Sequence, residues 1–300
     1  MGLLVDGVWR DIPREAAKDG AFVRPESAFR GTISIDGPFA PHAGRYHLYV
    51  ARSCPWAHRT LVVRALKGLE KAIPVFYAAP GKFEAGWEFP GSEFPFLHQL
   101  YSAAEPRYTG RVTVPVLWDS LTRRIMNNES AEIIRMLNRG FDAFARRRLA
   151  DLYPEKLRKE IDAVNEVVYR GLNNGVYRAG FATAQEKYDQ AVSEVFRTLD
   201  WLERRLAKRR WLCGPRLTEA DVRLFTTLVR FDAVYYSHFK CNLRRLVDYP
   251  RLWRYTKRFY ALPGVAATVS LTEIKTHYYR AMKHINPTQI VPKGPLLSFK

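Results

Sequence analysis

The feature that most constrains the fold is an alternation of strand and helix patterns in the first third of the chain. Residues 45–51, RYHLYVA, have high β propensity. Residues 55–70 follow with apolar side chains at helical spacing, and Pro55 suits a first helical turn. Residues 73–79, IPVFYAA, are typical of a second strand. A strand, a helix and a strand in this order predict a parallel pair with a right-handed crossover.

The next stretch interrupts this order and then returns to strands. Residues 80–110 contain many aromatic residues among Gly and Pro, and we expect a long irregular segment with a functional role. Residues 112–119 and 123–127 predict two strands about a turn, and residues 129–138 predict a short amphipathic helix. The order βαβ-ββα is that of a thioredoxin-like domain, which we place at residues 45–140.

From about residue 151 the pattern becomes helical. Two helices open on residues suited to a capping box, Thr183 with Glu186 and Thr218 with Asp221. The expected helices cover residues 160–172, 183–209, 217–231 and 251–265. The fold class is therefore α/β plus all-α. Its expected parts are an irregular arm at 1–44, the thioredoxin-like domain, an α-helical domain at 151–285 and an extended, Pro-rich tail at 286–300.

Composition excludes several classes of protein. The chain has 300 residues, of which 47% are hydrophobic and 26% charged, which indicates a soluble globular protein rather than a disordered one. No apolar run approaches the roughly 18 residues of a membrane span. The first residues lack the basic and then apolar pattern of a secretory signal. We therefore expect a cytoplasmic location and no membrane partner.

The net charge of +18, from 48 basic and 30 acidic residues, raises the possibility of nucleic acid binding. The densest basic clusters lie at residues 146–148 and 204–210, and the second falls inside a helical pattern. Solvated helix faces and helix C-termini explain such clusters better than a nucleic acid surface does. We expect no nucleic acid partner, although an attraction for small anions is compatible with the charge.

Cys54 is the candidate nucleophile. It follows a strand and directly precedes a helix, where backbone N–H groups and the helix dipole stabilise a thiolate. Arg52, His58 and Arg59 add possible positive charge, so we expect a thiol pKa lowered into the range of roughly 3.5–7.5 known for such sites. A redox disulfide motif would place a second cysteine three positions on, but that position is Ala57.

The other two cysteines, Cys213 and Cys241, lie in the helical part without such a setting. Three scattered cysteines form neither a disulfide framework nor a zinc site, and we expect no metal.

Two further motifs leave alternatives open. Pro115, in TVP, fits either a cis peptide after Val114, which would free the Val114 backbone groups for an extended peptide ligand, or an edge strand. Glu129 and Ser130, in NNES, open a helix. They suit the ammonium and carboxylate of an α-amino acid end, or they form a plain N-cap.

The motifs SCPWAHRT, GWEF, RVTVPVLWD, NNES, NNGVYRAGFA, LTEADVRLFTTLVRFD and HINPTQIVPKGP together resemble the glutathionyl-hydroquinone reductases. These form the Xi class of the glutathione transferase superfamily. The resemblance covers nearly the whole chain. It implies a thioredoxin-like domain, an α-helical domain, a homodimer, and glutathione as a co-substrate with glutathionylated hydroquinones as partners.

The resemblance also implies roles for individual residues. Cys54 attacks the glutathione sulfur of the substrate, the hydroquinone leaves, and a second glutathione resolves the mixed disulfide. Tyr177 is the implied proton donor, and Tyr235 and Tyr278 help to stabilise the thiolate. The implied glutathione contacts are Trp87, Arg111, Val112, Thr113, Val114, Glu129 and Ser130.

Three other functions compete with this one. An omega-type thiol transferase or dehydroascorbate reductase would use the same Cys54, although the aromatic segment at 80–110 favours a flat aromatic substrate. A conjugating transferase typically uses Ser or Tyr instead of Cys. A non-catalytic protein with this fold, recruited to nucleic acid by its charge, would not need a thiol at residue 54.

Overall fold

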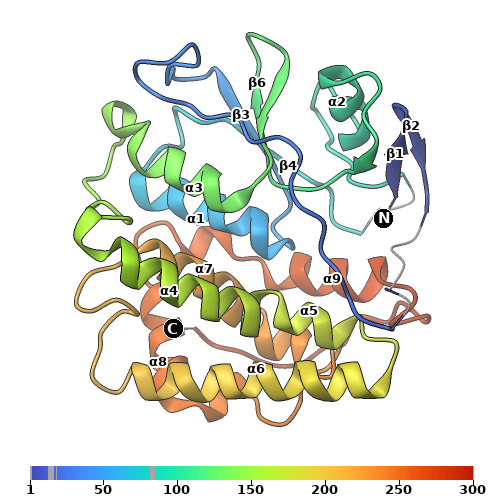
Figure 1. Ribbon diagram of the computed structural model, residues 1–300, viewed down its shortest axis with the longest axis vertical. Coiled ribbons are helices and arrows are strands. Elements are labelled where there is room, and N and C mark those ends of the chain that lie inside the picture. Colours follow the sequence, from blue (N-terminus) through green and yellow to red (C-terminus); the bar gives the residue numbers. More distant parts are fainter. Residues whose placement is uncertain (1, 13–16, 18, 82–84, 300) are drawn as a thin grey trace. The chain divides into compact units, whose positions relative to one another are not determined.

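The structure is a computed structural model that describes residues 2–12, 17, 19–81 and 85–299. It forms two compact units (Figure 1). The thioredoxin-like unit comprises Met1–Glu15, Glu26–Arg148 and Thr268–Lys283. The helical unit comprises Ala16–Pro25, Leu149–Ala267 and His284–Lys300. These units are defined by which residues contact one another, so they do not test the domain limits expected from the sequence. Those limits stay a prediction.

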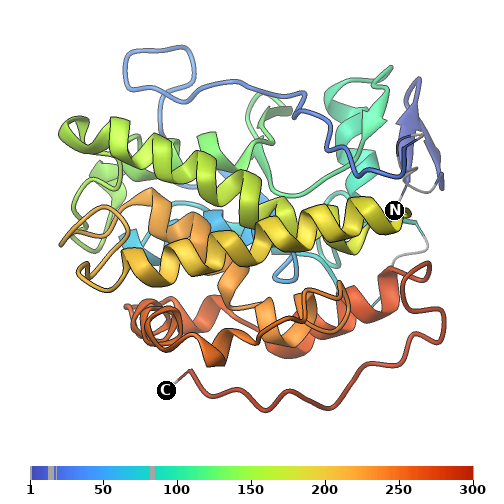
Figure 2. The same ribbon diagram turned by 60° about the horizontal axis from the view of Figure 1, so that its bottom comes forward.

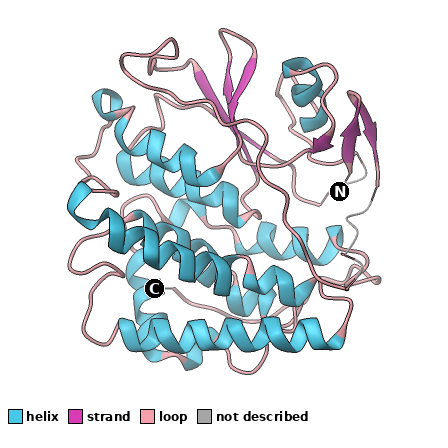
Figure 3. Ribbon diagram, in the orientation of Figure 1, coloured by secondary structure: helices cyan, strands magenta, loops and turns pink. Residues whose placement is uncertain are grey.

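A four-stranded sheet, in the order β4-β3-β6-β7, forms the core of the thioredoxin-like unit. Strand β3 (Tyr46–Val50) pairs in parallel with β4 (Val75–Tyr77) and antiparallel with β6 (Val116–Asp119). Strand β7 (Arg124–Asn127) pairs antiparallel with β6. The predicted order βαβ-ββα is confirmed, and Figure 3 shows the strands of this sheet in magenta.

Two helices complete this arrangement. Helix α1 (Pro55–Lys67) connects β3 to β4, and α3 (Ser130–Arg139) follows β7 and packs against α1. All four residues of β6 are buried, including Asp119, whose carboxylate is 2.6 Å from the Arg45 guanidinium. Because a buried charge needs a partner, this ion pair allows a carboxylate inside the sheet.

Part of the arm expected to be irregular is a β-hairpin. Strands β1 (Leu3–Val5) and β2 (Val8–Arg10) pair across a turn at Asp6 and Gly7, which both have positive φ, at 48° and 77°. Such a turn matches the twist of a hairpin, and Asp-Gly is a strong signal for it. Strand β1 also pairs with β5 (Gly110–Arg111), so the expectation for the start of the arm is wrong. Residues 1, 13–16 and 18 of that arm lie outside the described residues.

The segment at residues 80–110 is also more regular than expected. It contains helix α2 (Leu97–Ala104), in which Leu97, Leu100 and Tyr101 are buried. The eight-residue helix is too short to give a clear periodic pattern among so many aromatic residues. Residues 82–84 of this segment lie outside the described residues.

The helical unit is built mainly from α-helices, as the sequence predicts, and Figure 2 shows its long helix α6 in yellow. Its principal helices are α4 (Arg158–Val168), α5 (Gly175–Gly180), α6 (Gln185–Arg205), α7 (Glu219–Leu228) and α8 (Pro250–Tyr260). A π-helical turn at Tyr169–Asn173 extends α4, and another at Phe231–Tyr235 follows α7. In the described part of the chain, none of the helices is long and apolar enough to cross a membrane.

The remaining elements are shorter or belong to the other unit. Helix α9 (Leu271–Ala281) lies in the thioredoxin-like unit, although in sequence it follows the principal helices of the helical unit. Short 3-10 turns occur at Asp142–Phe144, Glu155–Leu157, Leu246–Asp248 and Ala266–Thr268.

The two capping predictions have different outcomes. Thr218 caps α7, and the Asp221 carboxylate accepts from the Thr218 backbone N–H at 2.8 Å, which confirms that box. Helix α6 begins at Gln185 with Ala184 as its N-cap, so the box predicted at Thr183 and Glu186 is wrong. The Thr183 N–H donates instead to the Gly20 carbonyl at 3.2 Å, which holds Thr183 outside the helix.

Candidate active site

Cys54 lies at the N-cap of α1 with extended backbone angles, φ −77° and ψ 120°. The Cys54 carbonyl accepts from the His58 N–H at 2.9 Å, so the residue is fixed to the first helical turn. Pro55 occupies the first helical positions and has no N–H to donate. The side chain is partly exposed. The thiol is therefore accessible at the positive end of a helix, as the sequence predicts.

The Val114–Pro115 peptide bond is cis, which is the first of the two possibilities for TVP. The Cys54 thiol donates to the Val114 carbonyl oxygen across 3.6 Å. The carbonyl is therefore already paired, contrary to the expectation that both Val114 backbone groups would be free. This contact favours the protonated thiol, whereas the helix N-terminus favours the thiolate.

Tyr101 connects the cis-proline segment to the start of α3. Its hydroxyl donates to the Thr113 carbonyl at 2.9 Å and accepts from the Thr113 N–H at 3.3 Å. The Asn128 side-chain amide also donates to this hydroxyl, at 3.0 Å. Burial raises the pKa of Tyr101, so the hydroxyl keeps the proton that it donates. Sequence reasoning did not single out Tyr101, since nothing local distinguishes it from the aromatic residues around it.

Glu129 and Ser130 form the start of α3. One Glu129 oxygen accepts from the Ala131 N–H at 2.9 Å, and the other accepts from the Ser27 hydroxyl at 3.0 Å. The Ser130 hydroxyl accepts from the Arg59 guanidinium at 3.3 Å and is buried. In this structure the pair thus acts as an N-cap, and the backbone N–H groups of the first turn of α3 face the same end.

The three residues near Cys54 that were candidates for positive charge have partners of their own. Arg52 forms an ion pair with Glu273 at 3.0 Å and lies 3.9 Å from the centre of the Tyr77 ring. His58 is fully buried and hydrogen-bonded to the Thr268 hydroxyl at 2.8 Å. Arg59 lies over the Trp56 ring and donates to the start of α3. The helix N-terminus is therefore the clearest source of thiolate stabilisation at this site.

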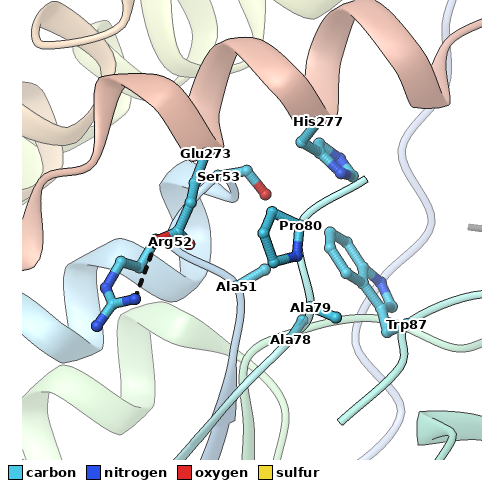
Figure 4. Close-up of a pocket in the computed structure, with 9 residues that line it drawn as sticks. All are labelled: Ala51, Arg52, Ser53, Ala78, Ala79, Pro80, Trp87, Glu273 and His277. Carbon is cyan, nitrogen blue, oxygen red and sulfur yellow. Dashed lines mark hydrogen bonds and ion pairs between the residues drawn. The ribbon is translucent and has the colours of Figure 1, made fainter. Parts of the chain in front are cut away.

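A pocket lies beside the residues that precede Cys54 (Figure 4). The Trp87 indole stacks on the His277 imidazole, with ring centres 4.8 Å apart and an angle of 13°. Helix α9 contributes both His277 and Glu273, which are one helical turn apart. Neither was a predicted site residue, although that spacing was a possible signal. The lining residues are Ala51, Arg52, Ser53, Ala78, Ala79, Pro80, Trp87, Glu273 and His277.

Arg111 and Val112 continue the cis-proline segment towards the N-terminal sheet. The Arg111 guanidinium donates to the Ile12 carbonyl at 2.8 Å, and Val112 is buried. Contacts and chain continuity thus link the Cys54 thiol, the Val114 segment and the start of α3 within one unit.

The predicted tyrosines fall into two groups. Tyr278, on α9, is buried in the unit that contains Cys54, and its ring packs edge-on against His277. Tyr177 and Tyr235 belong to the helical unit, are both buried, and have ring centres 6.1 Å apart. The structure therefore brings Tyr177 and Tyr235 together, as a pair that sequence spacing did not predict.

The three cysteines differ in accessibility, which leads to a labelling prediction. Burial raises the pKa of Cys213 to about 11, with the Asp221 carboxylate adding to the shift, and burial raises that of Cys241 to about 12. We expect iodoacetamide at neutral pH to label Cys54 in the native protein and to label all three cysteines only after denaturation. Peptide mass spectrometry would measure this selectivity. Native labelling of Cys213 at a rate similar to Cys54 would contradict it.

Comparisons with known proteins identify the family. Residues 53–139 match the N-terminal domain of glutathione S-transferases, and residues 185–258 match the C-terminal domain. Both halves of that architecture are present, with a cysteine at the start of α1, and the chain belongs to the glutathione S-transferase superfamily.

Relatives define the family more closely. The chain is 53% identical to the glutathionyl-hydroquinone reductase PcpF of Sphingobium chlorophenolicum, covering 98% of this chain and 96% of the relative. It is 49% identical to the glutathionyl-hydroquinone reductase YqjG of Escherichia coli, over 98% and 95%. A solved Xi-class transferase from Natrialba magadii superposes with a TM-score of 0.94 at 48% identity, covering 100% of this chain and 95% of that one. The chain is a member of the glutathionyl-hydroquinone reductase family, the Xi class.

Proposed function

We propose that the protein catalyses the reduction of S-glutathionyl-hydroquinones to hydroquinones, with glutathione as the co-substrate. The observation that carries the proposal is a partly exposed cysteine at the N-cap of α1 with Ala57, not a second cysteine, three residues on. Such a site forms a mixed disulfide but has no neighbouring thiol in the motif to resolve it. A second glutathione supplies that thiol.

The reaction has two steps that balance. The Cys54 thiolate attacks the glutathione sulfur of the substrate, an S–S bond forms, and the sulfur–carbon bond breaks. The bonding electron pair stays on the hydroquinone carbon, which takes up a proton. A glutathione thiolate then attacks the mixed disulfide, which releases oxidised glutathione and restores the Cys54 thiolate.

Glutathione has a peptide-like backbone and an α-amino acid end, and the site offers matching groups. We assign its amino acid end to the start of α3, where N–H groups and Ser130 suit the carboxylate and Glu129 suits the ammonium. We assign its backbone to Arg111–Val114, next to the Cys54 sulfur, and an additional contact to Trp87. The glutathione-bound structure of Escherichia coli YqjG superposes on this chain with a TM-score of 0.90, which supports a glutathione site.

The departing carbon needs a general acid, and a phenol suits this task. We propose Tyr177 as the proton donor and Tyr235 and Tyr278 as hydroxyls that stabilise the thiolate. We also propose a cytoplasmic homodimer without a resident metal.

A substrate comparison tests the function against its nearest alternative. Some relatives carry another name, such as the omega-like transferase 2 of Schizosaccharomyces pombe at 47% identity, covering 94% of this chain. We expect kcat/KM for glutathionyl-menadiol to exceed that for dehydroascorbate by at least about tenfold, or ~1.4 kcal/mol of transition-state binding. The aromatic segment at 80–110 suits the flat substrate. A preference for dehydroascorbate would reverse the assignment.

A further inference from the structure

Arg24 lies over the face of the Tyr177 ring. Its guanidinium carbon is 5.0 Å from the centre of that ring and 5.5 Å from the centre of the Phe22 ring. Both distances are within the roughly 6 Å over which a cation is attracted to an aromatic face. All three residues belong to the helical unit.

The short segment that carries Arg24 is anchored to this unit at two residues, Phe22 and Gly20. Phe22 is buried, with its ring centre 6.3 Å from Tyr177 and 5.1 Å from Phe181. The Gly20 carbonyl accepts from the Thr183 N–H at 3.2 Å. The guanidinium is therefore carried by a segment that is held at Gly20 and at Phe22.

A hydrogen bond fixes the direction of the Arg24 side chain. Its Nε donates to the Asn174 side-chain oxygen at 3.1 Å, and Asn174 caps α5, the helix that carries Tyr177. Asn174 and Tyr177 both lie in NNGVYRAGFA, a motif in which the proposed function uses Tyr177 alone. The motif thus supplies both a tyrosine and the acceptor that holds a cation above it.

We propose that Arg24 is a positioning residue for Tyr177, stabilising the phenolate left when Tyr177 gives up its proton. This inference rests on the proposed function, in which Tyr177 is the proton donor. The O–H bond of Tyr177 breaks, a C–H bond forms on the hydroquinone carbon, and a negative charge appears on the phenol. The phenolate then takes up a proton from solvent, and the second glutathione releases one to solvent when it attacks as thiolate, so the protons balance over the cycle.

A fixed guanidinium lowers the energy of this charge without moving during the reaction, as preorganised electrostatic groups do. The Tyr235 ring also packs against Tyr177. Its hydroxyl is neutral, so it stabilises a negative charge on Tyr177 less than a cation does. Among the described contacts of the Tyr177 ring, Arg24 is the residue that brings a positive charge to its face.

The test compares Arg24→Gln and Arg24→Lys in two backgrounds, the natural sequence and Tyr177→Phe. We expect Arg24→Gln to lower kcat about tenfold, because the phenolate loses its fixed cation, with KM for glutathione changed less than about twofold. Arg24→Lys should recover most of the loss, because it keeps the charge. In the Tyr177→Phe background, Arg24→Gln should cause no further loss, since the group through which it acts is absent.

Arg244→Gln is the matched control. Arg244 lies 4.6 Å from the centre of the Tyr249 ring, so this variant also removes a cation from a tyrosine face in the same unit. We expect it to keep full activity. Asn174→Ala, which removes the acceptor of the Arg24 hydrogen bond, should give a smaller loss in the same step and serves if Arg24→Gln folds poorly.

Rapid-quench mass spectrometry separates the two steps. We expect Arg24→Gln to slow formation of the Cys54 adduct and to leave its release by glutathione unchanged. Equal losses in both backgrounds would reduce Arg24 to a structural role and overturn the inference. Full activity of Tyr177→Phe would overturn both the proton-donor assignment and this inference. Full activity of Arg24→Gln, with Tyr177→Phe impaired, would overturn the inference alone.

Discussion

Cys54→Ser is expected to lower kcat for glutathionyl-hydroquinones by at least about 10³-fold. The substitution keeps the shape of the side chain at the start of α1 but replaces a nucleophilic thiol with a weak hydroxyl. The glutathionyl group of the substrate then has no thiolate to receive it, because Ala57 offers no substitute. Glutathione binding should persist, since none of its proposed contacts is removed.

Intact-mass spectrometry provides the measurement. After incubation with a glutathionyl-hydroquinone, the natural protein should carry one glutathione on Cys54, and added glutathione should remove it. Cys54→Ser should carry none, whereas Cys213→Ser, at a buried thiol whose pKa is raised to about 11, should keep both adduct and activity. Turnover that survives in Cys54→Ser would rule out the covalent mechanism.

Tyr177→Phe is expected to lower kcat by about 10²–10⁴-fold, the contribution typical of general acid catalysis. The ring would keep its packing against Phe239, whose centre is 5.3 Å away, so the change removes a hydroxyl and little else. The loss should fall on the first step, because the hydroquinone carbon takes its proton there. Attack of the second glutathione on the mixed disulfide needs no proton from Tyr177.

Rapid-quench kinetics of adduct formation would test this, with Tyr169→Phe as the control. Tyr169 belongs to the same unit but is 36% exposed, and its hydroxyl has no role in the proposed chemistry. An adduct that forms at the natural rate in Tyr177→Phe would assign the proton to another group. Slow release of the adduct would instead place Tyr177 in the second step.

Much of the thioredoxin-like unit could be predicted because its signals are local. The strand pattern at 45–51 and the helix pattern at 55–70 depend on neighbouring residues, and the structure has β3 and α1 within those limits. The hairpin near the N-terminus was missed despite its Asp-Gly turn, because β1 and β2 have only three residues each and show no clear alternation. The pairing of β1 with β5 joins residues about a hundred positions apart, which no local pattern indicates.

The candidate site divides in the same way. Cys54 could be inferred from residue types beside a helix and a strand, whereas TVP left the cis peptide at Val114 as one of two possibilities. Trp87 and the tyrosines came from a family resemblance, since their spacing carries no signal of chemistry. Arg24 escaped prediction because its hydrogen-bond partner, Asn174, is 150 residues away.

The path of the chain between the two units has a consequence for engineering. The helical unit takes Ala16–Pro25 from near the N-terminus, and the thioredoxin-like unit takes Thr268–Lys283 from near the C-terminus. One crossover point therefore cannot exchange either unit intact between two such enzymes. A chimaera joined near residue 149 would combine Arg24 from one parent with Asn174 from the other, and α9 from one parent with the sheet of the other. We expect such a chimaera to fold only when the segments from one parent fit the unit that comes from the other parent.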